Sequence, residues 1–194
     1  MRITGGESAG RHLKVPKGLG VRPTPDLVKQ AIFNSLGQRV ENARVLELFG
    51  GSGALSMEAL SRGAREAICV EKAASHARMI ARNADAIDLK PPRFQVRVQD
   101  AFTSLGQLAA DRQTFDLILA DPPYGDKNVG RRSTSFAQRM LDDPNLPSLI
   151  APGGLLMLGH TKRDTLEFTA AWEEIKTLKH GDTMIRFLQP AEPN

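Results

Sequence analysis

Short apolar runs alternate with longer amphipathic stretches along most of this chain. The apolar runs predict seven strands, over residues 44–49, 66–70, 94–98, 115–120, 154–159, 175–180 and 183–188. Apolar positions three and four residues apart predict helices between them, over residues 54–62, 73–88, 105–111, 133–142 and 163–171. Strands that alternate with helices form right-handed crossovers, so we expect a mostly parallel sheet with helices on both faces.

The last two predicted strands differ from the others because no helix separates them. Only Gly181-Asp182 lies between them, and this dipeptide is typical of a hairpin turn. The final strand should therefore run antiparallel to its neighbour. The predicted fold class is α/β, Rossmann-like, with a seven-stranded, mostly parallel sheet whose last strand is antiparallel.

A further helix is predicted before the first strand. Thr24 offers a capping hydroxyl, and Pro25 and Asp26 suit the first turn of a helix. Apolar residues follow at helical spacing, and Gly37 is a plausible stop.

The segment before this helix, residues 1–23, is rich in Gly, Lys, Arg and Pro. Residues 2–4 and 12–15 favour strand, which predicts a small β-hairpin arm outside the main fold, with residues 24–194 forming the main domain. The net charge of the chain is +4, and residues 1–29 hold all of it, with six basic and two acidic side chains. A basic arm on a neutral body indicates a polyanionic partner; the alternative is a solvated surface arm.

Composition narrows the class of protein. The 194 residues suit one domain. A single cysteine, Cys69, excludes an internal disulfide, and the four histidines show no spacing typical of metal ligands. The chain has no apolar run long enough for a bilayer, and its first residues lack the apolar core of a signal peptide. We therefore expect a cytoplasmic monomer with neither a membrane nor a metal as partner.

A glycine-rich turn follows the first predicted strand and precedes a helix. Such glycines allow a ligand to approach the backbone closely. NAD sites have the same turn, so the turn alone does not identify the cofactor. Glu71 and Asp100 end the next two strands, where ribose hydroxyls and an adenine amino group need acceptors. Glu47, within the first strand, suits the ammonium of an amino-acid nucleoside and would be ill-placed beside a pyrophosphate. The pattern favours S-adenosylmethionine; the alternative is that these carboxylates are merely solvated strand ends. The residues expected to contact the cofactor are Glu47, Phe49, Gly50, Gly51, Ser52, Gly53, Glu71, Lys72, Asp100 and Ala101.

The segment Asp121-Pro122-Pro123-Tyr124 follows the fourth predicted strand, at the edge where ligands of open α/β sheets bind. An exocyclic amine of a nucleobase is a poor nucleophile because its lone pair is delocalised into the ring. The Asp121 carboxylate and the Pro122 carbonyl can accept its hydrogens, and consecutive prolines hold these acceptors in place. Tyr124 offers a flat face on which a base can stack. These four residues are the candidate catalytic residues; the alternative is a Pro-Pro turn capped by aspartate.

In these segments and several others, the chain resembles the bacterial RsmD-type 16S ribosomal RNA guanine-N2 methyltransferases. The resemblance covers nearly the whole chain and includes Gly10-Arg11, Leu13-Lys14-Val15-Pro16, Arg22-Pro23-Thr24-Pro25-Asp26, residues 46–55 and 58–64, Val70-Glu71, Asp121-Pro122-Pro123-Tyr124 and Gly181-Asp182-Thr183. It implies a class I methyltransferase that acts on a guanine amino group in small-subunit ribosomal RNA. It also implies an arm that engages RNA, and an active-site entrance near Arg22 and Thr24. The candidate substrate-binding residues are Arg11, Arg22, Thr24 and Tyr124.

The chain departs from this family in two places. Residues 125–135 carry Lys127, Arg131 and Arg132, which either clamp phosphates or belong to a simple surface loop. Gly159-His160-Thr161-Lys162 stands where relatives more often have an acidic residue.

Three other functions fit parts of the sequence. A DNA adenine or cytosine amino-methyltransferase would use the same four catalytic residues. An NAD-dependent oxidoreductase would use the same glycine turn. An RNA-binding or assembly factor without catalysis would need only the basic segments.

Overall fold

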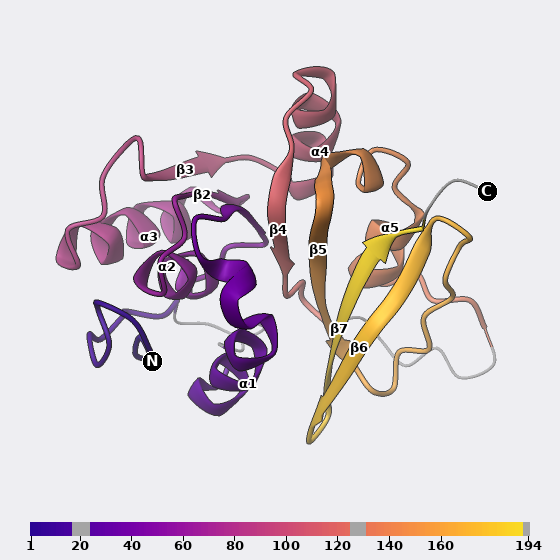
Figure 1. Cartoon of the computed structure of the whole chain (residues 1–194), viewed down its shortest axis with the longest axis horizontal. Coiled ribbons are helices and arrows are strands. Elements are labelled where there is room, and N and C mark those ends of the chain that lie inside the picture. Colours follow the sequence, from indigo (N-terminus) through magenta and orange to yellow (C-terminus); the bar gives the residue numbers. More distant parts are fainter. Residues whose placement is uncertain (17–23, 125–130, 192–194) are drawn as a thin grey trace.

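The computed structural model describes residues 1–16, 24–124 and 131–191. Seven strands form one sheet in the order β3-β2-β1-β4-β5-β7-β6 (Figure 1). Strands β1 to β5 pair in parallel, whereas β7 runs antiparallel to both β5 and β6, which confirms the predicted fold class. The strands are β1 (Arg44–Leu48), β2 (Glu66–Glu71), β3 (Phe94–Val98), β4 (Phe115–Ala120), β5 (Ile150–Thr161), β6 (Trp172–His180) and β7 (Thr183–Pro190).

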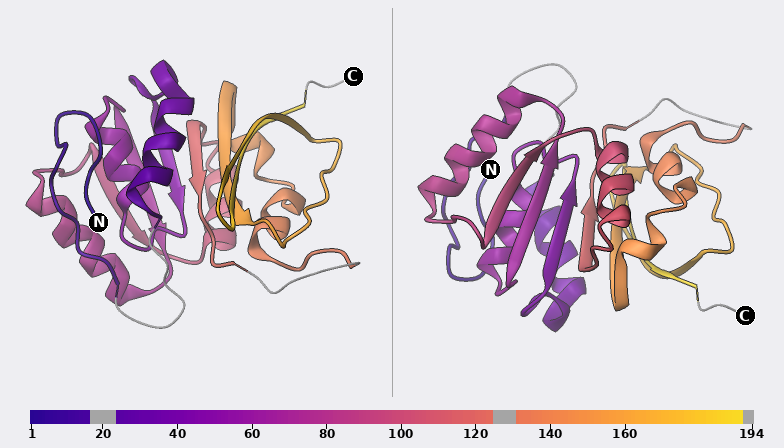
Figure 2. Two further views of the ribbon diagram at one scale, coloured as in Figure 1. Left: turned by 90° about the horizontal axis from the view of Figure 1, so that it is seen from below. Right: turned by 90° about the horizontal axis from the view of Figure 1, so that it is seen from above.

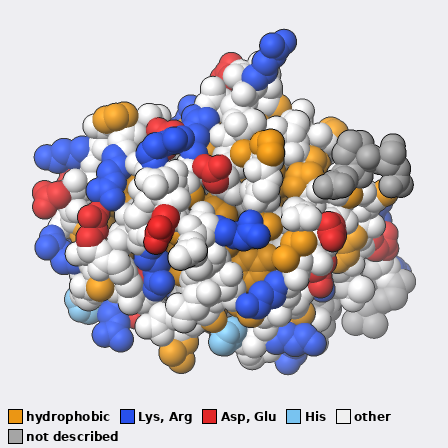
Figure 3. All heavy atoms as spheres, viewed as in Figure 1, with side chains coloured by type: hydrophobic (Ala, Val, Ile, Leu, Met, Phe, Trp, Pro, Cys, Tyr) orange, Lys and Arg blue, Asp and Glu red, His pale blue; other side chains and the backbone are white. Residues whose placement is uncertain are grey.

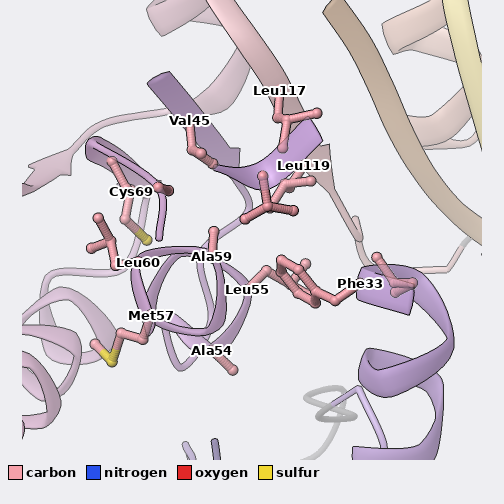
Figure 4. Close-up of a cluster of buried hydrophobic side chains, with 14 of the residues drawn as sticks. Phe33, Val45, Ala54, Leu55, Met57, Ala59, Leu60, Cys69, Leu117 and Leu119 are labelled. Carbon is pink, nitrogen blue, oxygen red and sulfur yellow. The ribbon is translucent and has the colours of Figure 1, made fainter. Parts of the chain in front are cut away.

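Helices cover both faces of this sheet (Figure 2). The α-helices are α1 (Asp26–Leu36), α2 (Ala54–Ser61), α3 (Ala74–Ala86), α4 (Ala101–Ala110) and α5 (Phe136–Asp142), with short 3₁₀ turns η1 (Gly37–Val40) and η2 (Pro147–Leu149). One buried cluster joins α1, α2 and α3 to the sheet, and a second joins α4 and α5 to the opposite face. In the first cluster, Phe33 of α1 and Leu55 of α2 lie beside Leu119 of β4 (Figure 4). Both faces of the central parallel strands β1, β2, β4 and β5 are therefore covered, whereas the edge strands β3 and β6 are partly exposed.

Two predicted helices differ from the structure. Residues 163–171, predicted as a helix, form an irregular segment that packs on α5. Its backbone satisfies its hydrogen bonds outside a helix: the Glu167 N–H donates to Gln138 Oε1 (2.8 Å), and Gln138 Nε2 donates to the Glu167 carbonyl (2.9 Å). Helix α4 begins at Ala101, four residues before its predicted start, because Asp100 caps its first turn.

Thr24 is not a helix cap. Helix α1 begins at Asp26, and Pro25, at its N-cap position, makes no side-chain cap hydrogen bond. The helix ends at Gly37, as predicted, with a positive φ of 54°. The Thr24 hydroxyl bonds instead to the side chain of Asp121, just after β4.

Residues 1–16, the described part of the N-terminal segment, do not form an arm outside the main fold. Its two predicted strands reduce to one antiparallel bridge between Arg2 and His12. Ile3 and Leu13 are buried in the cluster that contains α1 and α2. In Figure 1 the segment lies against the α2 and α3 end of the molecule. The segment is thus part of the hydrophobic core.

A buried carboxylate ties this segment to two helices. Glu58 of α2 is fully buried and accepts from the Thr4 N–H (2.8 Å) and the Thr4 hydroxyl (2.7 Å). It also pairs with Lys29 of α1 (3.3 Å) and with Arg62 (2.8 Å). Lys29 is completely buried, so its charge belongs to the fold and not to a surface.

None of the helices among the described residues has the length and apolar character needed to cross a bilayer.

Candidate active site

A cavity of about 840 Å³ opens at the carboxyl ends of β1, β2, β3 and β4. Its volume is within the range of sites that hold small-molecule cofactors, about 300–1,000 Å³. All of the expected cofactor contacts except Gly53 line it. The other lining residues used below are Thr24, His76, Gln99, Asp121, Pro123, Phe136 and Arg139.

The turn after β1 is shaped by the absence of side chains. Gly51 and Gly53 have positive φ values of 56° and 74°, which favour glycine. A Cβ at Gly50 would lie 2.5 Å from the Cys69 sulfur, and one at Gly53 would lie 2.8 Å from Ile80. Gly53 is the N-cap of α2, so it shapes the turn without lining the cavity.

Glu71 holds the rim of the cavity in place. Its two carboxylate oxygens accept from the Gly51 N–H (2.8 Å) and the Ala73 N–H (2.7 Å). The His76 ring lies 3.7 Å from the same carboxylate. The glycine turn, the end of β2 and the start of α3 therefore form one rigid unit, with a carboxylate at its centre.

Asp100 has a double role. It caps α4 by accepting from the Phe102 N–H (3.0 Å), and it pairs with Lys72 (3.2 Å). Desolvation would raise the pKa of Asp100, but the hydrogen bonds from Lys72 and the α4 amides outweigh it and lower the pKa. This carboxylate stays ionised, so it remains an acceptor.

The Glu47 carboxylate, which was expected to face the ammonium of the cofactor, is hydrogen-bonded to the start of α2. It accepts from the Ser56 N–H (3.0 Å) and hydroxyl (2.5 Å), at the start of the helix. Burial raises the pKa of Glu47 from 4.5 to about 7, against the effect of these hydrogen bonds. A cation bound in the cavity beside Glu47 would favour its ionised form.

An aromatic wall was not predicted from the sequence. The rings of Phe49, Phe102 and Phe136 lie 5.7–6.0 Å apart, and the Arg139 guanidinium lies 4.0 Å from the centre of the Phe102 ring. Phe136 and Arg139 are three residues apart in α5, so they share one face of that helix. The periodicity revealed this face, but nothing local in the sequence places α5 beside the carboxyl end of β3.

Asp121 stands between the large cavity and a second one of about 180 Å³. The smaller cavity is lined by Thr24, Pro25, Asp121, Pro122, Pro123, Tyr124 and Thr183. Thr24, Asp121 and Pro123 line both cavities. A ligand in one cavity and a ligand in the other would therefore meet at the Asp121 carboxylate.

The two oxygens of Asp121 have different surroundings. Oδ2 accepts from the Thr24 hydroxyl at 2.7 Å. Oδ1 is buried and has no hydrogen-bond partner among the described residues. Burial raises the pKa of Asp121, while hydrogen bonds from Thr24 and Tyr124 act against that rise. The Tyr124 phenol oxygen also lies 3.1 Å from the Thr183 hydroxyl, within hydrogen-bond distance, and the ring is partly exposed.

One candidate substrate-binding residue, Arg11, lies away from both cavities. Arg11 is exposed and donates to the Ala86 carbonyl at the end of α3, and it does not line either cavity. Arg22 and Lys127 lie outside the described residues. Arg132 pairs with Asp142 (2.7 Å) and Glu167 (3.5 Å), so its charge is partly neutralised.

The sequence contained no signal for a second buried group near the site. His160 of β5 is buried and accepts from Arg186 Nε (2.9 Å). Burial, together with the nearby Arg186 charge, lowers the pKa of His160. Within the described ranges, no group of three or more metal-ligating side chains comes together.

A doubly wound sheet with an antiparallel β7 and a cavity at the ends of β1 to β4 defines a class I methyltransferase. The chain belongs to the family described as Conserved hypothetical protein 95, whose model matches residues 1–189. This confirms the relationship to the RsmD-type enzymes.

Individual relatives agree with that assignment. Ribosomal RNA small subunit methyltransferase D of Escherichia coli is 36% identical over 124 residues, which are 64% of this chain and 60% of that protein. YlbH of Bacillus subtilis is 39% identical over 130 residues, which are 66% of this chain and 70% of that protein. The solved structure of E. coli YhhF is 26% identical, with a TM-score of 0.79 over 100% of this chain and 99% of that one.

Proposed function

We propose that this protein transfers a methyl group from S-adenosylmethionine to the exocyclic N2 amine of a guanine in 16S ribosomal RNA. The observation that carries the proposal is the position of Asp121, a buried carboxylate between two cavities with one oxygen that lacks a partner among the described residues. Buried acceptors are normally satisfied, so an unsatisfied carboxylate oxygen in a residue that lines both cavities marks Asp121 as a candidate for ligand binding.

The residues of the large cavity fit the proposed cofactor. Glu71 suits the ribose hydroxyls, and Asp100, ionised and fixed by α4, suits the adenine amino group. The ring of Phe49 and the Arg139–Phe102 pair form a flat wall for the adenine. Glu47, at the inner end, faces the place for the methionine ammonium. When bound, the cofactor supplies a methyl group carried on positively charged sulfur.

The smaller cavity fits a base whose amine points at Asp121. The Asp121 carboxylate accepts one amine hydrogen, and the Pro122 carbonyl accepts the other. These contacts orient the nitrogen lone pair toward the large cavity. A carboxylate is too weak a base to deprotonate the neutral amine first, so the proton leaves with or after methyl transfer. Its burial makes Asp121 a better proton acceptor than an exposed aspartate.

The substrate is inferred from the relatives. The E. coli relative is named as a small-subunit ribosomal RNA methyltransferase, and guanine N2 comes from the sequence resemblance. We propose an assembled or assembling small subunit as the partner. We further propose that the protein acts as a monomer in the cytoplasm.

The test is methyl transfer to small subunits that lack the modification. With methyl-tritiated cofactor, label should enter 16S ribosomal RNA, and mass spectrometry should place it on one guanine N2. Asp121→Ala should abolish transfer, whereas Asp85→Ala, at an exposed position of α3, should leave it unchanged. Label that enters duplex DNA but not ribosomal RNA would contradict the proposal and favour a DNA amino-methyltransferase.

Thermal stabilisation by added ligand distinguishes a protein that binds S-adenosylmethionine from one that binds NAD. S-adenosylhomocysteine should raise the Tm of the protein, and NAD should not. The opposite result would favour an oxidoreductase. Asp121→Ala should retain this protection, because the residue lies at the edge of the cofactor cavity and its proposed role is toward the amine.

A further inference from the structure

The Thr24 hydroxyl makes a contact that helix α1 does not need. Thr24 precedes α1 by two residues but is not its cap. Its hydroxyl instead donates to Asp121 Oδ2, at 2.7 Å, across 97 residues of sequence. Threonine is stiff about χ1, which makes it a well-defined donor. The segment that leads into α1 is therefore bonded directly to the carboxylate at the end of β4.

This contact makes the two oxygens of Asp121 unequal. Oδ2 is occupied by Thr24, whereas Oδ1 is buried with no partner in the described part of the chain. Gly159 of β5 packs against Oδ1, and a Cβ at that position would lie only 2.3 Å from it. The carboxylate can hold this orientation only because residue 159 lacks a side chain.

We propose that Thr24 is a positioning residue, whose hydroxyl fixes the orientation of the Asp121 carboxylate with respect to the amine of the substrate base. This inference rests on the proposed function and deepens it. Thr24 acts through Asp121 and need not touch the base itself. It lines both cavities, so it stands where the donor and acceptor ligands would meet.

A second consequence concerns the protonation of Asp121. A hydroxyl that donates to a carboxylate favours its ionised form, against the effect of burial. Without Thr24, the carboxylate would be both less well oriented and protonated at a higher pH. A protonated Asp121 accepts hydrogen bonds less well. As the pH is lowered, the rate of the variant should therefore begin to fall at a higher pH than the rate of the unaltered protein.

Two kinds of substitution isolate the hydroxyl. Thr24→Val keeps the shape of the side chain and removes the hydrogen-bond donor. Thr24→Ala removes the donor and also makes the side chain smaller. Thr24→Ser keeps the donor. Thr177→Val, at a half-buried position of β6 remote from both cavities, is the matched control. Each protein is assayed for methylation of unmodified small subunits across pH, and for S-adenosylhomocysteine binding.

Thr24→Val and Thr24→Ala should lower kcat about 10- to 100-fold, with unchanged S-adenosylhomocysteine affinity. The acidic limb of their pH–rate profiles should move to higher pH, and Thr24→Ser should restore both values. A purely structural role would lower Tm without moving that limb. Wild-type kcat and an unmoved limb in the valine or alanine variant would overturn the inference.

One measurement does not depend on activity. In ¹³C NMR titrations, the Asp121 carboxyl signal is identified by its loss in Asp121→Asn. Its pKa should rise in the variants without the hydroxyl and stay unchanged in Thr24→Ser. If the unaltered protein methylates no RNA, the proposed function fails, yet this titration still decides the inference: an Asp121 pKa that does not respond to the hydroxyl overturns it.

Discussion

Gly159 of β5 leaves the space that the Asp121 carboxylate occupies beside β4. Residues 120 and 158 are partners in the β4–β5 pair, so the next residues, Asp121 and Gly159, come side by side. A glycine inside a strand often marks the close approach of another group. That signal was present in the sequence, but the group in question could be named only once the register of β5 was known.

Gly159→Ala should disable the site while leaving the cofactor cavity intact. The added Cβ would meet Asp121 Oδ1 at 2.3 Å, so the carboxylate must rotate away. We expect methylation to fall at least about 100-fold, with S-adenosylhomocysteine affinity retained. Gly106→Ala is the control, because a Cβ there meets nothing within 4 Å in helix α4, and it should raise stability by about 0.4–1 kcal/mol. An active Gly159→Ala protein would contradict this account of the site.

Glu47 predicts a pH dependence of stability with a definite sign. Its pKa is 4.5 in an unfolded chain and about 7 in the fold, so the folded protein holds a proton that the unfolded chain releases. The free energy of unfolding should therefore be largest below pH 4.5 with respect to this group, fall between pH 4.5 and 7, and level off above. At about 1.4 kcal/mol for each pH unit, the change is about 3 kcal/mol.

Glu47→Gln removes this titration. The difference in unfolding free energy between the unaltered protein and the variant, from urea unfolding at several pH values, should shrink by that amount between pH 4.5 and 7. The difference cancels the other titrating groups, which both proteins share. Parallel pH curves for the two proteins would show that Glu47 is not protonated by burial.

At the scale of elements, the alternation of strands and helices predicted the sheet well, and the errors share a cause. Periodicity describes which face of a segment is apolar but not which distant group satisfies its backbone. The segment 163–171 has a helical pattern, yet the backbone N–H and carbonyl of Glu167, at its centre, are hydrogen-bonded to Gln138 of α5. Thr24 has the chemistry of a cap, yet Asp121 takes its hydroxyl. In each case a long-range contact overrode a local preference.

The Glu58 cluster is another product of long-range contacts. The pairing of Glu58 with Arg62, four residues on, was readable from helical spacing. Its bonds to Thr4 and Lys29 were not, because they join segments 54 and 29 residues apart. As a result, the basic N-terminal segment appeared to be an independent arm.

Glu58→Ala should destabilise the protein severely. It removes the buried carboxylate partner of the Lys29 ammonium and leaves only the longer contact with Asp26 (3.6 Å), and breaking a buried pair in this way costs about 3–5 kcal/mol. Urea unfolding should show this loss as a lower midpoint. Glu66→Ala removes a partly exposed carboxylate that pairs with Arg44, and should cost at most about 1 kcal/mol. Equal effects of the two substitutions would mean that the cluster does not hold the N-terminal segment in place.

At the scale of the whole molecule, the structure changes the meaning of the charge distribution. The net charge lies within residues 1–29, but Lys29 is buried and Arg2 pairs with Asp26 (3.3 Å). Less of this charge is therefore available to RNA than the sequence suggested. Figure 3 shows Lys and Arg side chains spread over the left, centre and bottom of one face, not gathered in one region. A polyanion would have to be bound by basic residues from several elements.

Two of these residues stand close to the smaller cavity. Lys162 and Arg163 follow β5, and both pair with Asp182 at the β6–β7 turn (2.8 and 3.8 Å). Asp182 adjoins Thr183, which lines that cavity. Both basic side chains are about half exposed. RNA whose base entered the cavity would bring its phosphates near this pair.

The double substitution Lys162→Ala, Arg163→Ala should therefore weaken RNA binding without affecting the cofactor. A binding titration with a 16S ribosomal RNA fragment at several salt concentrations should give a higher Kd. The slope of log K against log salt should be smaller by about 0.7 for each phosphate that the two side chains no longer neutralise. Arg112→Ala is the matched control, because this exposed residue lies beyond the amino end of β4, whereas Asp121 follows its carboxyl end (Figure 1). If both variants bind RNA equally well, the acceptor RNA does not approach over the β6–β7 turn, and its phosphates must be bound on the other side of Asp121, toward α1.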